Sequence, residues 1–171
     1  MSVTIGDEAP DFDLRDQDGN AVRLSSLRGT SAVALVFFPF AFTGVCEGEL
    51  CQLRDDVSTF EHQGVQVLAV SCDSGPTQKQ WAEQKGWTFP VLSDFWPHGE
   101  TARAYGVLNE DLGCAMRGTF LIDRDGKVVD SFESDGLGTP REVAALHRGP
   151  GRVGLGVQRL DHVGSALRPG A

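Results

Sequence analysis

The sequence predicts an α/β domain in which helices flank a central mixed β-sheet. The segment 32–38 is continuously apolar and the segment 65–71 is mostly apolar, a pattern typical of strands that are buried on both faces. Each is followed by a segment with helical periodicity, and two further strands, 118–123 and 127–132, come later around a turn. Strands that alternate with helices and then form a hairpin indicate a sheet with both parallel and antiparallel neighbours.

The chain before the first buried strand is expected to form a β-hairpin. Residues 11–14 alternate between polar and apolar side chains, and residues 21–24 supply the second arm. Between them, Asp18 and Gly19 form a strong turn signal. The predicted fold therefore has an N-terminal hairpin beside the main sheet.

The elements after the first buried strand follow from apolar spacing and from turn residues. A helix is expected from Cys46 to about His62, with Gly64 as its stop. Its apolar side chains recur three and four residues apart: Leu50, Leu53, Val57 and Phe60. The later elements are the strand 65–71, a helix over about 77–85, a short edge-like segment over 88–93, a helix over 99–105, the two strands around the turn 123–126, and a last helix from about 139–140.

Composition and charge exclude several functional classes. The chain has 171 residues, 40% hydrophobic and 23% charged, which suits one domain with its own core. A net charge of -9 repels phosphate backbones, so nucleic acid is not an expected partner. The longest apolar run, 32–42, is far shorter than the roughly 20 residues that span a bilayer. The N-terminus is acidic, unlike a signal peptide, and we expect a cytoplasmic protein without a membrane partner.

A change of composition divides the chain into a domain, 1–146, and a tail, 147–171. The tail contains six glycines, two prolines and four arginines but one acidic residue. Glycine-rich sequence loses much conformational entropy on ordering, which favours a loosely ordered appendage. The tail also contains scattered apolar residues, so docking on the acidic domain or on a partner stays open.

The four cysteines are expected to be free thiols: Cys46, Cys51, Cys72 and Cys114. Nothing marks the chain as secreted, so a disulfide framework is not expected. Zinc is not expected because there is no Cys-x2-Cys pair and the four histidines lack ligand spacing. Cys72 and Cys114 are interpreted as packing residues.

Cys46 is the candidate nucleophile because of its place in the predicted fold. The strand that ends at Phe38 leads through a loop into a helix, and Cys46 lies in the first helical turn. Unpaired N–H groups and the positive end of the helix dipole favour a thiolate there. Thiolate is the reactive form of cysteine, and a helix N-terminus can make it abundant at neutral pH.

Three residues could complete a site around this thiol. Pro39 would rigidify the loop and shield the sulfur from water, and the Thr43 hydroxyl could hydrogen-bond the sulfur and an oxygen of an incoming substrate. Arg117 directly precedes the strand 118–123, from which a neighbouring strand could direct it at the loop. A guanidinium there would stabilise the thiolate and the charge on a leaving oxygen.

These residues together resemble the signature of the peroxiredoxin family, Pro39-x3-Thr43-x2-Cys46. Further matching blocks are 37–39, 42–44, 117–120 and the opening 9–12, and the resemblance covers about residues 3–146. Within the family the chain is most similar to the actinobacterial alkyl hydroperoxide reductases of the E type, through residues 46–50 and 93–99.

The resemblance implies a thioredoxin-like fold and a peroxidase that reduces hydrogen peroxide or organic hydroperoxides. Cys46 would be the peroxidatic cysteine and would pass through a sulfenic acid, supported by Pro39, Thr43 and Arg117, with Glu49 holding the arginine. The resemblance implies no metal, haem or flavin cofactor. It also implies a homodimer, and thioredoxin, or mycothiol with mycoredoxin, as the reductant.

Cys51 departs from the one-cysteine pattern of the most similar relatives. Its distance of five residues from Cys46 resembles the resolving cysteine of the bacterioferritin-comigratory subgroup. Five residues along a helix advance about 7.5 Å and turn the side chain some 140° away. A disulfide needs Cα atoms within about 7 Å, so pairing would require the first helical turns to unwind. Cys51 is therefore either a resolving cysteine or a small core residue, with an external thiol as the alternative resolving agent.

Two other functions fit this sequence less well than the peroxidase does. A thioredoxin-like disulfide reductase needs Cys-x-x-Cys, but Glu49 stands where the second cysteine would be. A binding or chaperone module on the same fold would have no reason to contain Pro39, Thr43, Cys46 and Arg117 together. The sequence therefore favours the peroxidase.

Overall fold

The structure is a computed structural model that describes residues 2–134 and 137. The elements of this part of the chain are, in order, β1 (Asp13–Arg15), β2 (Ala21–Arg23), a 3-10 turn (Leu24–Leu27), β3 (Ala32–Phe37), α1 (Gly44–His62), β4 (Val65–Ser71), α2 (Gly75–Lys85), β5 (Val91–Ser93), α3 (Glu100–Ala104), β6 (Leu108–Asn109), β7 (Cys114–Ala115), β8 (Gly118–Ile122) and β9 (Val128–Glu133). The expected helix from 139–140 and the predicted tail 147–171 lie outside the described residues.

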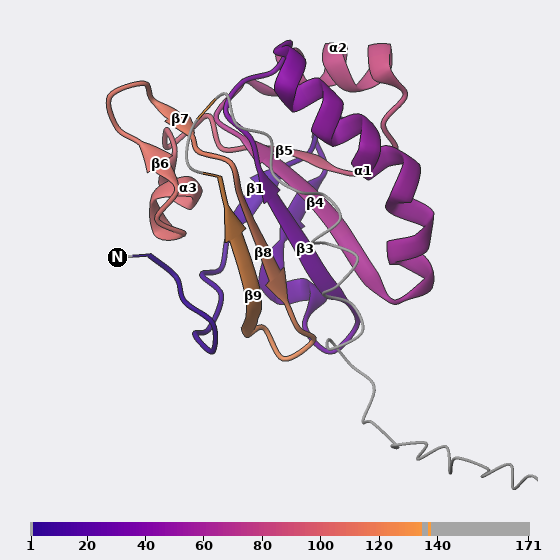
Figure 1. The fold of residues 1–171 in the computed structure, drawn as a ribbon, viewed down its shortest axis with the longest axis vertical. Helices are drawn as coiled ribbons and strands as arrows, with labels where there is room; N and C mark the ends of the chain where they lie inside the picture. Colours follow the sequence, from indigo (N-terminus) through magenta and orange to yellow (C-terminus); the bar gives the residue numbers. More distant parts are fainter. Residues whose placement is uncertain (1, 135–136, 138–171) are drawn as a thin grey trace, which may run out of the picture.

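Seven strands form one mixed sheet in the order β2-β1-β5-β4-β3-β8-β9 (Figure 1). The central strands β3, β4 and β5 are parallel to one another. The hairpin β1–β2 joins β5 in an antiparallel manner, and β8 joins β3 in the same way, followed by β9. The predicted α/β fold with a mixed sheet and an N-terminal hairpin is confirmed.

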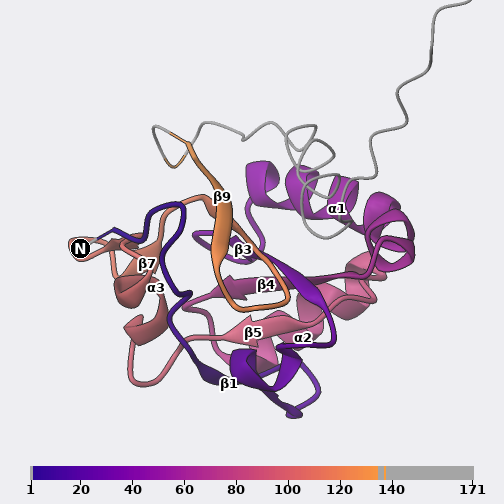
Figure 2. The same ribbon diagram turned by 90° about the horizontal axis from the view of Figure 1, so that it is seen from below.

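Helices cover both faces of this sheet, which explains why β3 is apolar throughout and β4 is mostly apolar. In Figure 2, α1 and α2 lie on one face and α3 lies on the other. Along β3, Ala34 and Val36 point into the core under α1 and α2, whereas Val33, Leu35 and Phe37 point into the core near α3. Successive side chains of a strand alternate between faces, so a strand covered on both sides needs no polar residues.

The helix boundaries follow the predicted stop signals. α1 ends at His62, and Gly64, with φ of 72°, turns the chain into β4. α2 ends at Lys85 with Gly86 in the left-handed conformation, φ 66°, that favours glycine. α1 and α2 each begin two residues before the predicted start, at Gly44 and Gly75.

The prediction that residues 88–93 form an edge segment was wrong. β5 lies inside the sheet, parallel to β4 on one side and antiparallel to β1 on the other, with Arg15 opposite Ser93. The N-terminal hairpin covers the edge that β5 would otherwise expose. Val91 and Leu92 are accordingly fully buried.

A small two-stranded sheet, β6–β7, was not predicted. Asn109 pairs with Cys114, so Cys114 belongs to a strand and not to a loop. The two arms are only two residues long, too short for an alternating pattern to be visible in the sequence. Among the described residues, none of the helices has the length and apolar character needed to span a bilayer.

Candidate active site

Cys46 lies in the first turn of α1, directly after the loop that leaves β3. Thr43 still has an extended backbone and precedes the helix, which begins at Gly44. The N–H groups of this turn have no partner four residues earlier within the helix, and the helix dipole is positive here. The Cys46 side chain is fully buried. A negative charge on its sulfur would therefore be held by the protein and not by bulk water.

Arg117 provides the cation of the site. It directly precedes β8, and β8 pairs with β3 so that Thr119 lies opposite Val36, near the end of β3 that leads to the loop. Its Nη2 donates a hydrogen bond to Cys46 Sγ at 3.1 Å. Its Nη1 donates to Glu49 Oε2 at 2.6 Å, and its Nε donates to the Leu137 carbonyl at 3.0 Å. All three nitrogens of the guanidinium are therefore engaged.

The ion pair between Arg117 and Glu49 is buried on both sides. The two side chains are 2% and 5% exposed. Breaking a buried pair from one side leaves an uncompensated charge, which is strongly destabilising. Glu49 lies one turn after Cys46 on α1, so the carboxylate fixes the guanidinium over the first turn of the helix.

The two predicted loop residues differ in their surroundings. Pro39 is buried directly after the buried Phe38. The Thr43 hydroxyl donates a hydrogen bond to the Phe40 carbonyl at 2.9 Å. Because its proton is used there, the oxygen lone pairs are what Thr43 can offer to a hydrogen-bond donor such as a hydroperoxide.

Cys51 lies on the same regular helix as Cys46. The helix runs without interruption from Gly44 to His62, and both thiols are free. Cys51 is half-buried. The N-terminal half of α1 is also tied to α2. The Lys85 ammonium forms an ion pair with Glu47 at 2.7 Å, and the main-chain carbonyl of Lys85 accepts a hydrogen bond from the Arg54 side chain at 3.0 Å. A bond between the two cysteines would require the first turns of α1 to unwind.

The remaining two cysteines are buried away from water. Burial is the main reason that the pKa of the Cys72 thiol is raised to about 12, and nearby Asp94 adds to the effect. Burial also raises the pKa of Cys114, with a smaller contribution from Asp73. Both thiols are therefore protonated at neutral pH, the form that does not react as a nucleophile.

Native protein is expected to resist alkylation at Cys72 by iodoacetamide. With a pKa of about 12, roughly one Cys72 thiol in ten thousand is ionised at pH 8, and ionisation rises as the pH approaches 12. Mass spectrometry of protein alkylated before and after unfolding in guanidinium chloride measures this protection. Equal rates of Cys72 modification in the native and unfolded protein would contradict the expected burial.

The sequence analysis missed Asp73 and Trp81 as parts of this region, and it gave no sign of the backbone conformation of Phe42. Asp73 Oδ2 accepts a hydrogen bond from the Ala41 N–H at 2.8 Å. Phe42 has φ of 60°, and its ring packs on Trp81 of α2 with centroids 5.6 Å apart. An acidic residue after a buried strand gives no sequence signal for such a contact, because its partner lies 32 residues earlier.

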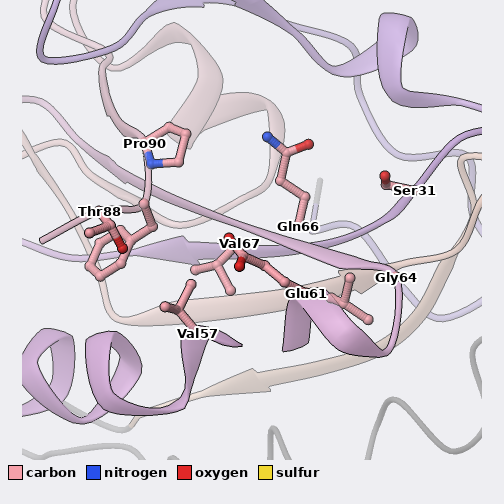
Figure 3. A pocket seen from close by; sticks show the side chains of 10 residues that line it. Ser31, Val57, Glu61, Gly64, Gln66, Val67, Thr88 and Pro90 are labelled. Atoms are coloured by element: carbon pink, nitrogen blue, oxygen red, sulfur yellow. The ribbon is translucent and has the colours of Figure 1, made fainter. Parts of the chain in front are cut away.

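A pocket of about 250 Å³ lies at the other end of the sheet and is not the candidate site. It is lined by the start of β4, the C-terminal part of α1 and the segment before β5, as Figure 3 shows for Val67, Glu61 and Pro90. Cys46 follows the opposite, C-terminal end of β3, and no predicted site residue lines the pocket. Within residues 2–134 and 137, no three His, Cys, Asp or Glu side chains gather as metal ligands.

Comparison with known proteins gives the family. The model of the AhpC/TSA family matches residues 5–131. Alkyl hydroperoxide reductase E of Mycobacterium tuberculosis is 56% identical over 124 residues, which cover 72% of this chain and 81% of the relative. Among solved structures, peroxidoxin BcpB of Mycobacterium tuberculosis has a TM-score of 0.73 at 36% identity, covering 78% of this chain and 88% of its own.

A second solved structure supports the same relationship. AhpC of Mycobacterium tuberculosis has a TM-score of 0.76 at 29% identity and covers 88% of this chain and 98% of its own. The predicted thioredoxin-like peroxiredoxin fold and the predicted family are confirmed by these matches. The chain therefore belongs to the AhpC/TSA family: it is a peroxiredoxin, a thiol-dependent peroxidase.

Proposed function

We propose that Cys46 is the peroxidatic cysteine and reduces hydrogen peroxide or organic hydroperoxides. The observation that supports this most strongly is the guanidinium of Arg117, 3.1 Å from Cys46 Sγ in a buried site. The thiolate attacks one peroxide oxygen, the O–O bond breaks, and the other oxygen leaves as water or an alcohol after taking a proton. The sulfur is oxidised to a sulfenic acid while the peroxide is reduced.

The other predicted residues support this step. Arg117 stabilises the thiolate and the charge that develops on the leaving oxygen, and Glu49 keeps the guanidinium in place. Thr43 accepts a hydrogen bond from the peroxide through the lone pairs left by its bond to Phe40. Pro39 keeps the loop rigid and excludes water.

Two routes lead from the sulfenic acid back to the thiol. In the first, an external thiol condenses with Cys46, and a thioredoxin- or mycoredoxin-type protein completes the reduction. In the second, Cys51 condenses with Cys46 after the first turns of α1 unwind. The ties of those turns to α2 and Arg117 favour the external thiol.

Mass spectrometry after one equivalent of peroxide tests the proposal and separates the two routes. We expect dimedone to label Cys46 and no other cysteine of the described domain, because the sulfenic acid persists until a thiol arrives. A Cys46–Cys51 disulfide in the non-reduced protein would instead assign the resolving role to Cys51. Unmodified Cys46 beside an oxidised cysteine elsewhere would contradict the proposed nucleophile.

Assembly and location complete the proposal. The protein acts in the cytoplasm as a homodimer, and its contact surface includes Phe42 and Trp96. These side chains are 52% and 80% exposed, which is unusual for large aromatic residues and typical of a contact surface. Analytical ultracentrifugation of wild-type protein would measure whether it is a dimer, and the same measurement on Trp96→Ala would test whether Trp96 belongs to the contact surface.

A further inference from the structure

The loop between β3 and α1 has a conformation that its own sequence does not favour. Phe42 lies in the left-handed region, with φ of 60°, where bulky residues are rare. Such a backbone persists only where surrounding contacts hold it. The ring of Phe42 on Trp81 is one such contact, and the hydroxyl of Thr43 on the Phe40 carbonyl is another. Asp73, which follows β4, provides a third from outside the loop.

Asp73 and Thr43 bind opposite sides of one peptide group. Asp73 Oδ2 accepts from the N–H of Ala41 at 2.8 Å, and Thr43 Oγ1 donates to the carbonyl of Phe40 at 2.9 Å. That N–H and that carbonyl belong to the same peptide unit, which is planar and rigid. The Asp73 carboxylate therefore fixes the direction of the carbonyl that receives the Thr43 hydroxyl.

The carboxylate of Asp73 is itself fixed by a buried polar network. The Ser71 hydroxyl donates to the same Oδ2 at 2.7 Å and accepts from Gln78 Nε2 at 2.9 Å. The Ser93 hydroxyl donates to the Asp73 carbonyl at 2.7 Å. Ser71 and Gln78 are fully buried. Because both ends of Asp73 are held, the carboxylate resists displacement when the loop moves.

We propose that Asp73 is a positioning residue of the peroxidase, which orients the Thr43 hydroxyl through the peptide group between Phe40 and Ala41. The inference rests on the proposed roles of Thr43 and Cys46. Asp73 affects the recognition of the peroxide by Thr43. It does not affect the intrinsic reactivity of the Cys46 thiolate, which depends on Arg117. Loss of the carboxylate frees the peptide group to rotate, and the Thr43 hydroxyl then loses its fixed acceptor.

A double-mutant cycle between Asp73→Ala and Thr43→Ala tests this coupling. In the wild-type background, D73A is expected to lower the second-order rate constant for hydrogen peroxide at least about tenfold, because small misplacements of a recognition group are costly. In the T43A background the same substitution is expected to change the rate constant less than about twofold, since its target is gone. Equal effects in the two backgrounds would overturn the proposal.

Alkylation of reduced Cys46 by iodoacetamide separates positioning from general damage. Iodoacetamide needs the thiolate but no peroxide-binding hydroxyl, so its rate in D73A is expected to stay within about twofold of wild type. A parallel fall in alkylation and in peroxide reduction would overturn the proposal in favour of a structural role. A wild-type protein that consumes no peroxide would overturn the proposed function and, with it, this inference.

Two further variants serve as controls. Asp73→Asn keeps an acceptor oxygen for the Ala41 N–H and is expected to retain the peroxide rate within about threefold, since only the charge assistance is lost. Asp123→Ala is the matched control, because it removes another carboxylate that accepts from backbone N–H groups, those of Asp125 and Lys127 in the turn between β8 and β9, away from the loop. It is expected to react like wild type, and a tenfold loss in this variant would contradict the assignment to the carboxylate of Asp73.

The proposal stays testable if D73A does not fold. Asp73→Ser keeps a polar side chain that is too short to reach the Ala41 N–H, and it can replace D73A in the cycle. Hydrogen exchange of the Ala41 amide in reduced wild-type protein needs no variant at all. Exchange at least about tenfold slower than that of a free loop amide is expected, and unprotected exchange would overturn the proposal.

Discussion

Replacing Cys46 by serine is expected to lower the second-order rate constant for peroxide reduction on the order of 10⁴-fold or more. A serine hydroxyl has almost no ionised form at neutral pH, even beside the guanidinium of Arg117, and an un-ionised oxygen is a poor nucleophile toward peroxide. The rest of the site remains, but binding alone cannot break the O–O bond. Loss of the nucleophile is therefore the largest single effect that the structure predicts.

Peroxide consumption coupled to oxidation of a small thiol measures this loss. Cys72→Ala is the matched control, because it removes another buried thiol that is protonated at neutral pH and has no proposed role. It is expected to keep the wild-type rate, with circular dichroism showing that both variants are folded. A Cys46→Ser protein as active as wild type would sink the assignment of the nucleophile.

Arg117→Lys is expected to lower the same rate constant by about 10²-fold despite the conserved charge. The guanidinium uses three separate nitrogens for Cys46, Glu49 and Leu137. A lysine offers one nitrogen on a flexible chain, so it cannot satisfy the buried carboxylate and the sulfur with the same geometry. The net charge of the site would stay the same, but the hydrogen-bond donors would no longer point at the sulfur and at the charge that develops on the leaving oxygen.

A surface arginine provides the control for Arg117. Arg103→Lys makes the same substitution in the ion pair between Arg103 and Glu110, whose two side chains are 55% and 65% exposed. It should leave the rate constant for peroxide reduction unchanged. Arg117→Met should also lower the free energy of unfolding by about 3–5 kcal/mol relative to wild type, and by more than Arg117→Lys does, because the buried Glu49 carboxylate would lose the cation that compensates its charge. Urea unfolding measures that difference. Equal peroxide rates in Arg117→Lys and wild type would show that charge alone suffices.

The sequence was sufficient to predict the parts of the fold that depend on local pattern. The buried strands 32–38 and 65–71 were recognisable from their apolar runs, and the helix that begins near Cys46 was recognisable from its apolar spacing and from its stop at Gly64. Arg117 was a candidate because it directly precedes the strand 118–123, from which a neighbouring strand could direct it at the loop. That β8 is the neighbour of β3, and that the guanidinium reaches Cys46, are findings of the structure.

Other features depend on contacts between segments that are distant in the sequence, and the local pattern of apolar and polar residues could not predict them. The interior position of β5 depends on the pairing of Arg15 with Ser93, and the apolar run before Ser93 looks the same at an edge or inside a sheet. The bond from Ala41 to Asp73 likewise joins residues whose spacing in the sequence carries no signal. A hydrogen bond to a backbone N–H leaves no trace in the identity of the residue that donates it.

The third hydrogen bond of Arg117 has a practical consequence for engineering the protein. Its acceptor, the Leu137 carbonyl, lies after β9, the last strand among the described residues. A chain shortened to end at Ser134 would contain every element of the sheet and every proposed catalytic side chain, yet the guanidinium Nε would lack this acceptor. Shortened or tagged versions of this protein should therefore keep at least residues 2–137. The Arg117 guanidinium is held partly by a main-chain carbonyl that lies outside the sheet.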